Sequence, residues 1–444
     1  MSDKFDFSDY LRNTLGSYSP YSLRIILNKT YSEDNEDLPG IDSFNKRDYV
    51  TLFHEFTHQL QNISSIIGFK QFNSIISIWH NTRNIAYDPN DTISNFNRDR
   101  AMTILQSYHC VDNNRPQKFG LLNITHIDGL DGIKAQKFTE NPIKINYLYN
   151  DTDFSLTFGI GEFYESCADT LECFFAKKIK LHNNGSESTS IPYKIAESMA
   201  KKICPECSEF RLIILMLTSL QHAAPHQMLV FLMYTYGKIQ CDDQVIKNKC
   251  EEHVKNLLDL NTVWAIEIGN MIDNGFPYKD PYLGDVIKSF NISIKENINN
   301  RKNSPFIELD FLMEINEINY KEKIKSFIES FGGSIIYAKN QFNEMEKIVI
   351  GDCNSIYHNH KGWLTFNTSI AISSKKPLIL NESNTINYEE YKCPVISYCD
   401  HENKINNYNF CEKSPFNHPQ ASEAENNCAH QLALYKTDLK NHYK

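Results

Sequence analysis

Residues 54–58 read HEFTH, and this stretch decides how the sequence around it is interpreted. Apolar residues recur at helical spacing on both sides of it, so the sequence predicts a helix over residues 48–67, with Gly68 as its C-terminal stop. Four residues separate His54 from His58, which puts both imidazoles on the polar face of that helix. The two side chains can therefore share one metal ion, although two surface histidines on an amphipathic helix would show the same spacing.

Glu55 directly follows the first histidine of this HExxH pattern. In such a pattern the carboxylate accepts a proton from a metal-activated water and later returns it to the leaving nitrogen, so Glu55 is the candidate general base. A catalytic zinc ion takes three protein ligands and leaves its fourth position to water. The sequence should therefore supply one further ligand from another element.

The third ligand is sought in residues 161–169, which read GEFYESCAD at the start of a helix expected to reach residue 178. Helical spacing places Glu162, Glu165 and Asp169 on one face of that helix. From spacing alone, either glutamate could bind the metal. A neighbouring carboxylate could then orient a histidine ligand by accepting its hydrogen bond.

The two segments together resemble the gluzincin metallopeptidases, in particular the neprilysin-like pattern of a HE-x-TH helix followed by a second helix that carries Glu-x-x-Ala-Asp. The letters ESCAD, from Glu165 to Asp169, correspond to that second helix, and the resemblance covers these two segments only. It implies a zincin-like catalytic lobe in which one Zn²⁺ ion is held by His54, His58 and Glu165. It also implies that Asp169 accepts a hydrogen bond from a zinc-bound histidine. Glu162 would then lie beside the metal ligands but would not bind the metal itself.

Hydrolysis of a peptide bond also requires a donor that stabilises the oxyanion of the tetrahedral intermediate. His222 and His226 are the candidates, because they interrupt an apolar run downstream of the proposed ligand helix. The same residues can be core histidines whose ring nitrogens bond to the backbone or to other side chains, and the sequence favours this second interpretation.

The 444 residues are 41% hydrophobic, which is the composition of an ordinary globular protein, and they exceed the length at which a single core usually stops growing. We therefore expect a predominantly α-helical α+β fold. Residues 1–47 are interpreted as an irregular lead-in, residues 48–334 as the catalytic domain with a small sheet within 119–158, and residues 335–444 as an irregular C-terminal appendage that contains Cys and His. Further helices are predicted near residues 191–202, 208–221, 226–236, 243–272 and 307–330.

The formal charge of -10 and the lack of a sustained Lys/Arg block argue against nucleic acid as a partner. The most apolar stretch, residues 212–233, is interrupted by polar residues that a membrane-spanning helix tolerates poorly. The N-terminal residues lack the basic and apolar segments of a secretory signal, so a cytoplasmic protein without membrane contact is expected. The expected partner is a protein or peptide substrate, and a regulatory partner stays undefined.

Twelve cysteines without a recognisable export signal predict free thiols or metal ligands more than a disulfide framework. A second, structural zinc ion near Cys393, Cys399, Cys411 and Cys428 is one hypothesis, and free thiols are the other. Residues 204–207, CPEC, have the CxxC spacing. They lack the second motif of a zinc ribbon and the strand-to-helix setting of a thioredoxin, so they are interpreted as a pair at a helix junction.

Together with the resemblance, these patterns favour a zinc metalloendopeptidase with Glu55 as general base. Two alternatives stay open. In the first, the scaffold is a catalytically silent regulatory or binding module in which the metal only holds the fold. In the second, the enzyme is a defence or toxin peptidase with one narrow target.

Overall fold

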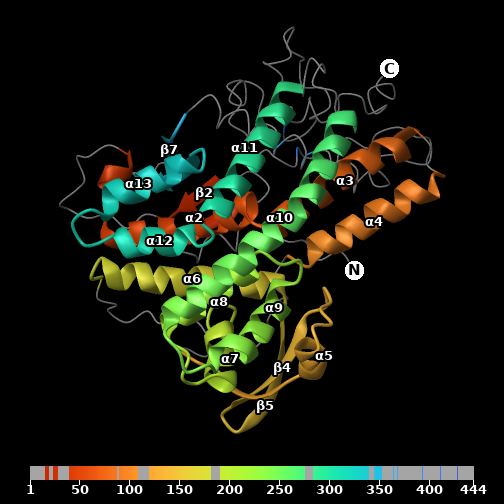
Figure 1. Ribbon diagram of the computed structural model, residues 1–444. Coiled ribbons are helices and arrows are strands. Elements are labelled where there is room, and N and C mark those ends of the chain that lie inside the picture. Colours follow the sequence, from red (N-terminus) through yellow and green to blue (C-terminus); the bar gives the residue numbers. More distant parts are fainter. Residues whose placement is uncertain are drawn as a thin grey trace.

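The computed structural model describes most of the chain up to residue 352 and five single residues beyond it. The described residues are 16–19, 24–28, 40–87, 90–108, 120–181, 191–275, 284–339 and 345–352, with Leu364, Thr368, Cys393, Cys411 and Cys428. Over these ranges the fold is α+β and mainly helical, with two small sheets (Figure 1). The predicted fold class is confirmed at this level.

Helix α2 (Lys46–Ser64) carries the HEFTH stretch. It begins at a capping box, in which the Asn45 side chain accepts from the backbone N–H of Asp48 at 2.9 Å and the Asp48 carboxylate accepts from the Asn45 N–H at 3.0 Å. The predicted helix is confirmed, but it ends at Ser64, before the expected stop. Gly68 instead lies in the first turn of α3 (Ile66–Tyr87), where a Cβ would overlap the carbonyl oxygen of Asn62. The glycine thus allows α3 to begin tightly against the end of α2.

A four-stranded sheet packs near α2 and joins distant parts of the chain. Its strands are β1 (Gly16–Ser19), β2 (Arg24–Leu27), β6 (Ser334–Lys339) and β7 (Met345–Ile350), in the order β1-β2-β6-β7. β2 pairs in parallel with β6, and the other two pairings are antiparallel. The expected irregular lead-in is therefore wrong for β1 and β2. Strands of four residues are too short for their alternation to be recognised in the sequence.

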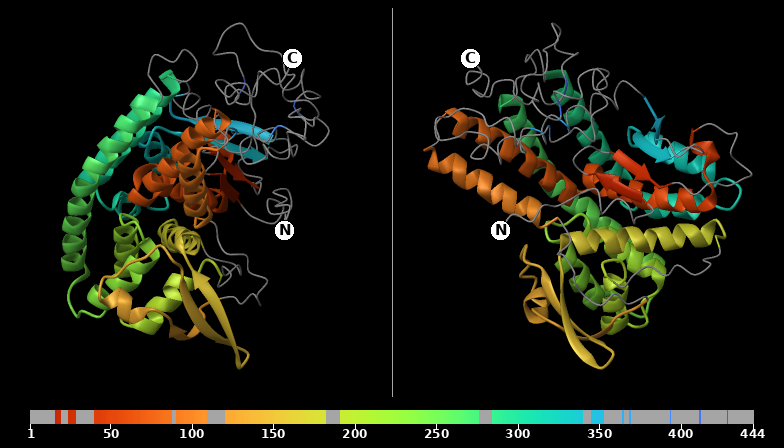
Figure 2. Two further views of the ribbon diagram at one scale, coloured as in Figure 1. Left: turned by 90° about the vertical axis from the view of Figure 1, so that its right-hand side faces the viewer. Right: turned by 180° about the vertical axis from the view of Figure 1, so that it is seen from behind.

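The sheet predicted within residues 119–158 is confirmed. It consists of β3 (Asn123–Ile127), β4 (Ile143–Tyr149) and β5 (Thr152–Phe158), all antiparallel, with the short helix α5 (Leu130–Lys134) between the first two strands. The hairpin of β4 and β5 extends away from the helical body (Figure 2). After β5 the chain turns directly into α6, so this sheet positions the start of the second site helix.

Helix α6 (Ile160–Lys178) lies between α2 on one side and a group of shorter helices on the other (Figure 1). The predicted helices are all present, except that the one near 307–330 is two helices separated at residues 315–319. The remaining helical elements are η2 (Gly40–Ser43), α4 (Thr92–Gln106), α7 (Ile195–Ile203), α8 (Glu209–Ser219), α9 (Pro225–Leu232), η3 (Met233–Gly237), α10 (Asp243–Gly275), α11 (Gly284–Asn303), α12 (Ile307–Glu314) and α13 (Tyr320–Ser330).

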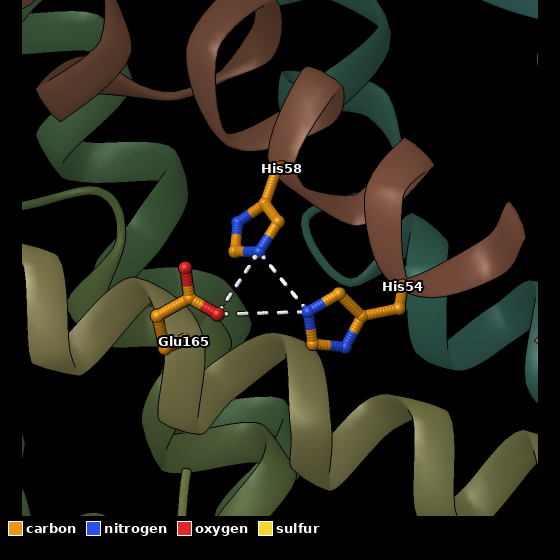
Figure 3. Close-up of side chains that lie close together, drawn as sticks. All are labelled: His54, His58 and Glu165. Atoms are coloured by element: carbon orange, nitrogen blue, oxygen red, sulfur yellow. Dashed lines mark hydrogen bonds and ion pairs between the residues drawn. The ribbon is translucent and has the colours of Figure 1, made fainter. Parts of the chain in front are cut away.

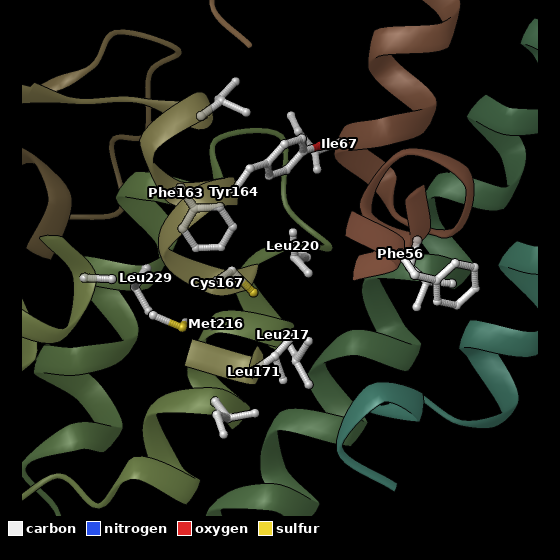
Figure 4. Packing of buried hydrophobic residues seen from close by; sticks show 14 of the residues in the cluster. Phe56, Ile67, Phe163, Tyr164, Cys167, Leu171, Met216, Leu217, Leu220 and Leu229 are labelled. Atoms are coloured by element: carbon white, nitrogen blue, oxygen red, sulfur yellow. The ribbon is translucent and has the colours of Figure 1, made fainter. Parts of the chain in front are cut away.

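The core holds α6 against both neighbours. On one side Cys167 and Leu171 lie among side chains of α8, including Leu217 (Figure 4). On the other side the rings of Phe53 and Phe175 stack at 4.9 Å and join α2 to α6. Among the described helices, none combines the length and the apolar character needed to cross a bilayer.

Candidate metal centre

Three metal-ligand side chains meet in the space between α2 and α6. The Nε2 atoms of His54 and His58 lie 3.2 Å apart, and the Oε2 atom of Glu165 lies 3.6 Å from the first and 3.4 Å from the second (Figure 3). The three ligand atoms all fall within 4.8 Å of one another, and within the described ranges no other three His, Cys, Asp or Glu residues meet in this way. The prediction that Glu165 would join the two histidines is therefore confirmed as geometry.

Each imidazole is oriented by a hydrogen bond at Nδ1, the ring nitrogen that does not face the other ligands. The Nδ1 atom of His54 lies 2.8 Å from Oε2 of Glu172, and that of His58 lies 2.9 Å from Oε1 of Gln61. The Gln61 amide nitrogen in turn donates to the carbonyl oxygen of Tyr164 at 3.2 Å. These acceptors favour the tautomer with the proton on Nδ1, which leaves both Nε2 lone pairs directed at the shared point.

Asp169 does not take the orienting role expected of it. Its Oδ2 atom forms an ion pair with Lys194 Nζ at 2.8 Å, and both Nδ1 atoms of the histidines are already occupied by Glu172 and Gln61. Glu172 lies seven residues after Glu165, on the same helical face and one turn beyond Asp169. The expectation for Asp169 is thus wrong, because the packing of α6 against α2 places the later carboxylate next to His54.

Glu162 caps the N-terminus of α6. Its Oε2 atom accepts a hydrogen bond from the Gly159 N–H at 2.9 Å, so the carboxylate satisfies a backbone donor in the first turn of α6. Its predicted place beside the ligands stays a prediction. The capping bond keeps the side chain at the N-terminus of α6, while Glu165 one turn later faces α2.

Glu55 is buried beside the cluster, under strand β1. Its side chain is 6% exposed, and a Cβ placed on Gly16 would lie 2.9 Å from Glu55 Oε1, so the strand passes directly over the carboxylate. Burial raises the pKa of Glu55 to about 7, against the lowering influence of His54 and His58 and with a further rise from Glu165. A carboxyl group with such a pKa can exchange a proton near neutral pH.

The carboxyl groups and imidazoles of the cluster shift one another's pKa values. Burial opposes ionisation of Glu165, but the neighbouring imidazoles of His58 and His54 outweigh it and lower the pKa of this carboxyl group. Burial likewise disfavours charged imidazoles, yet Glu165 and its neighbours raise the pKa of both histidines. Three carboxyl groups, Glu55, Glu165 and Glu172, thus surround two imidazoles, and a divalent cation bound there would replace the protons on the imidazoles as the partner of Glu165.

The two histidines proposed as oxyanion donors make their described contacts in another part of the molecule. His226 is fully buried and its Nε2 bonds to the carbonyl oxygen of Asn141 at 2.9 Å, while the His222 Nδ1 accepts from the Ala224 N–H at 3.1 Å and the ring packs on Phe138. Burial lowers the pKa of His226 to about 4, so its ring stays neutral. These contacts support the core-histidine interpretation.

Tyr193 is a site residue that sequence reasoning missed. Its ring meets the imidazole of His54 edge-on, with 6.1 Å between ring centroids. The segment that carries it is fixed to α6 at two points: the Pro192 carbonyl oxygen accepts from Ser166 Oγ at 2.8 Å, and Lys194 pairs with Asp169. Tyr193 lies just before α7, within the range 191–202 that was predicted to be helical, but no motif or ligand spacing marked it as a site residue.

The second zinc hypothesis falls partly outside the described residues. Cys393, Cys411 and Cys428 are buried, and the Cys393 N–H donates to the Cys411 carbonyl oxygen at 2.9 Å. Cys399 lies outside the described residues. A structural metal at this place stays a prediction.

Comparison of the chain with protein-family models, with curated proteins and with solved structures finds no match. Function must therefore be inferred from the geometry and chemistry of the site itself. What the site offers is two imidazole nitrogens and one carboxylate oxygen aimed at a common point, with Glu55 adjacent to them. This combination can bind a divalent metal ion and exchange a proton beside it.

Proposed function

We propose that the chain is a zinc-dependent metalloendopeptidase that hydrolyses peptide bonds in a protein substrate. The observation that carries the proposal is the convergence of His54 and His58 from α2 with Glu165 from α6, beside the buried carboxyl group of Glu55. Two histidines at helical spacing arise easily by local geometry alone. A carboxylate from a separate helix at the same point does not, and it completes a ligand set of the gluzincin type.

The donor set fits zinc. Catalytic zinc sites commonly use two histidine nitrogens and one glutamate oxygen and leave a position open for water, which is the set that His54, His58 and Glu165 provide. When bound, zinc would polarise the scissile carbonyl and lower the pKa of a water molecule towards about 7. Glu172 and Gln61 would keep the two imidazoles in the orientation that binding requires.

Glu55 is the residue that would move the proton. It follows His54 on the same helix, so its carboxylate lies beside the cluster without belonging to it. In this position it would accept a proton from the attacking water and deliver it to the leaving amine. Strand β1 and the side chain of Thr51 limit where the carboxylate can lie, because Gly16 approaches both.

The sheet next to the site favours a peptide as the substrate. β1 is at one end of the strand order β1-β2-β6-β7, and its first residue, Gly16, lies against Glu55. An extended peptide that paired with this edge strand would bring its own backbone to the general base. Such pairing uses hydrogen bonds to the main chain of the substrate, so it suits an enzyme that cleaves within a polypeptide.

Substitution of Glu55 by Gln tests the proposal. We expect Glu55→Gln to keep one zinc ion per chain and to lose cleavage, because the amide cannot accept the proton, whereas Glu165→Ala should lose the metal as well. Zinc is measured by elemental analysis of the purified protein, and cleavage with a denatured protein and a peptide library. Undiminished cleavage by Glu55→Gln would refute the assignment of the base. Zinc binding without cleavage by the wild-type protein would favour a catalytically silent scaffold.

A further inference from the structure

A pair of cysteines lies at the junction of α7 and α8, on the far side of α6 from α2. Cys204 ends α7, with its N–H donating to the Ala200 carbonyl oxygen at 2.7 Å. The Cys207 N–H then donates to the Cys204 carbonyl oxygen at 2.8 Å, which closes a β-turn over Pro205. In a β-turn the first and fourth Cα atoms are less than about 7 Å apart, and disulfides span about 4.4–6.8 Å between Cα atoms. The backbone thus already holds the two residues within disulfide range.

The two thiols face one another. They are hydrogen-bonded, and a Cβ on Gly237 would lie only 2.6 Å from Cys204 Sγ, so the sulfur is confined against the backbone of η3. Cys204 is 2% exposed, whereas Cys207 is partly exposed. One sulfur of the pair is therefore accessible to a reagent, and the other lies behind it.

Cations stand beside this pair. The hydrogen bond from Cys207 lowers the pKa of Cys204 against the effect of burial, and Lys238 and Arg211 lower it further. Arg211 is held rigidly, since its guanidinium donates to Asp243 at 2.6 Å and to the carbonyl oxygens of Ile239 and Cys241, each at 2.7 Å. The positive charge thus favours a thiolate at Cys204, while the hydrogen bond to Cys204 and burial raise the pKa of Cys207.

We propose that Cys204 and Cys207 form a reversible dithiol–disulfide couple whose redox partner is a low-molecular-weight disulfide of the glutathione type. The closed turn, the contact between the thiols and the difference in their exposure carry this proposal. Metal binding by the pair is disfavoured, because within the described residues no third His, Cys, Asp or Glu ligand lies with them. The inference does not depend on the proposed peptidase function.

The exchange has two steps. In the first, the Cys204 thiolate takes the proton of the partly exposed Cys207 across their hydrogen bond. The Cys207 thiolate so formed attacks the small disulfide, forms a mixed disulfide with one half of it, and releases the other half as thiolate. In the second, the released thiolate takes the proton of Cys204. The Cys204 sulfur then attacks Cys207 Sγ, which forms the intramolecular bond and expels the second small thiolate. From the pair that shares one proton, the protein loses two electrons and that proton. The small disulfide becomes one thiol and one thiolate, and the thiolate takes its proton from water.

The test uses the folded full-length protein in buffers of increasing oxidised-to-reduced glutathione ratio. After each equilibration the thiols are alkylated and the peptides are mapped by mass spectrometry. We expect the peptide that contains residues 204–207 to change from doubly alkylated to internally disulfide-bonded in one two-electron transition, while circular dichroism stays unchanged. Alkylation of both cysteines at every ratio, or a persistent glutathione adduct on Cys207, would overturn the proposal.

Serine variants test which cysteines form the disulfide. Cys207→Ser should abolish the transition and leave Cys204 slow to alkylate, because the accessible sulfur is gone. Cys241→Ser is the matched control, since Cys241 is also partly exposed and its backbone touches the same Arg211 side chain. We expect Cys241→Ser to show the wild-type transition. A disulfide between Cys207 and Cys241 in the wild-type protein, or loss of the transition in Cys241→Ser, would contradict the assignment.

Discussion

Substitution of Gly16 by Ala probes the placement of the general base without touching a metal ligand. Gly16 opens β1 at the point where the strand crosses α2. The added methyl group would lie 2.9 Å from Glu55 Oε1 and 2.8 Å from Thr51 Cγ2. His54, His58 and Glu165 are not among its nearest contacts, so the metal site should keep its ligands.

The size of the effect follows from these distances. Ordinary van der Waals contact begins at 3.4 Å, so the Glu55 carboxylate must move by at least 3.4 − 2.9 = 0.5 Å. Displacement of a reacting group by about 1 Å can lower a rate by about 100-fold. Half that displacement predicts a kcat for Gly16→Ala that is about tenfold lower, with unchanged zinc content.

The assay is cleavage of a peptide substrate at saturating concentration, with zinc measured on the same samples. Gly132→Ala in α5 is the matched control, because a Cβ there meets nothing within 4 Å. Adding Thr51→Ser to Gly16→Ala removes the methyl group that blocks the new side chain, so it should recover part of the lost activity. Equal kcat values for Gly16→Ala, Gly132→Ala and the wild type would refute the placement of Glu55 as the base under β1.

Two further predictions concern side chains away from the open metal position. Glu172→Gln should weaken zinc affinity by about tenfold, because the carboxylate that accepts from His54 Nδ1 at 2.8 Å loses its charge. The affinity is measured by competition with a chelator. An unchanged affinity would show that Glu172 does not orient His54. His226→Gln keeps a donor for the Asn141 carbonyl oxygen but cannot titrate. The pKa of His226 is about 4 in the folded state and 6.5 in the unfolded state, so between these pH values the unfolded state binds more protons. The contribution of the neutral His226 to the free energy of unfolding is therefore fully present above pH 6.5. It falls by about 3 kcal/mol as the pH is lowered towards 4. Denaturant unfolding should show a smaller loss for the variant, and parallel pH profiles would contradict this.

The helical core of the site was predictable because it depends on local geometry. The spacing of His54, Glu55 and His58 follows from the helical repeat, which any stable helix at this place must obey. The apolar flanks that predicted the helix are the residues that bury it, such as Phe53 and Phe56. Glu165 was found by its pattern, since one segment combined a glutamate with helical spacing and a resemblance to known metal sites.

The order of the four-stranded sheet was not predictable. β2 pairs with β6 across some three hundred intervening positions, and each strand has only four to six residues. Pairing over such a separation is decided by the packing of the helices between the strands, and it leaves no local signature in either one. The proximity of Gly16 to Glu55 is a product of that pairing.

Which residues surround the metal ligands was decided by tertiary structure alone. Asp169 and Glu172 follow Glu165 on one face of α6, and both are acceptable partners for a histidine by spacing. The sequence determined that a carboxylate-rich helix would meet the histidine helix. The packing of α6 against α2, which includes the stacked rings of Phe53 and Phe175, determined that Glu172 reaches His54 while Asp169 binds Lys194. Helical periodicity is a property of one segment, whereas the relative position of two helices depends on the packing of the whole core.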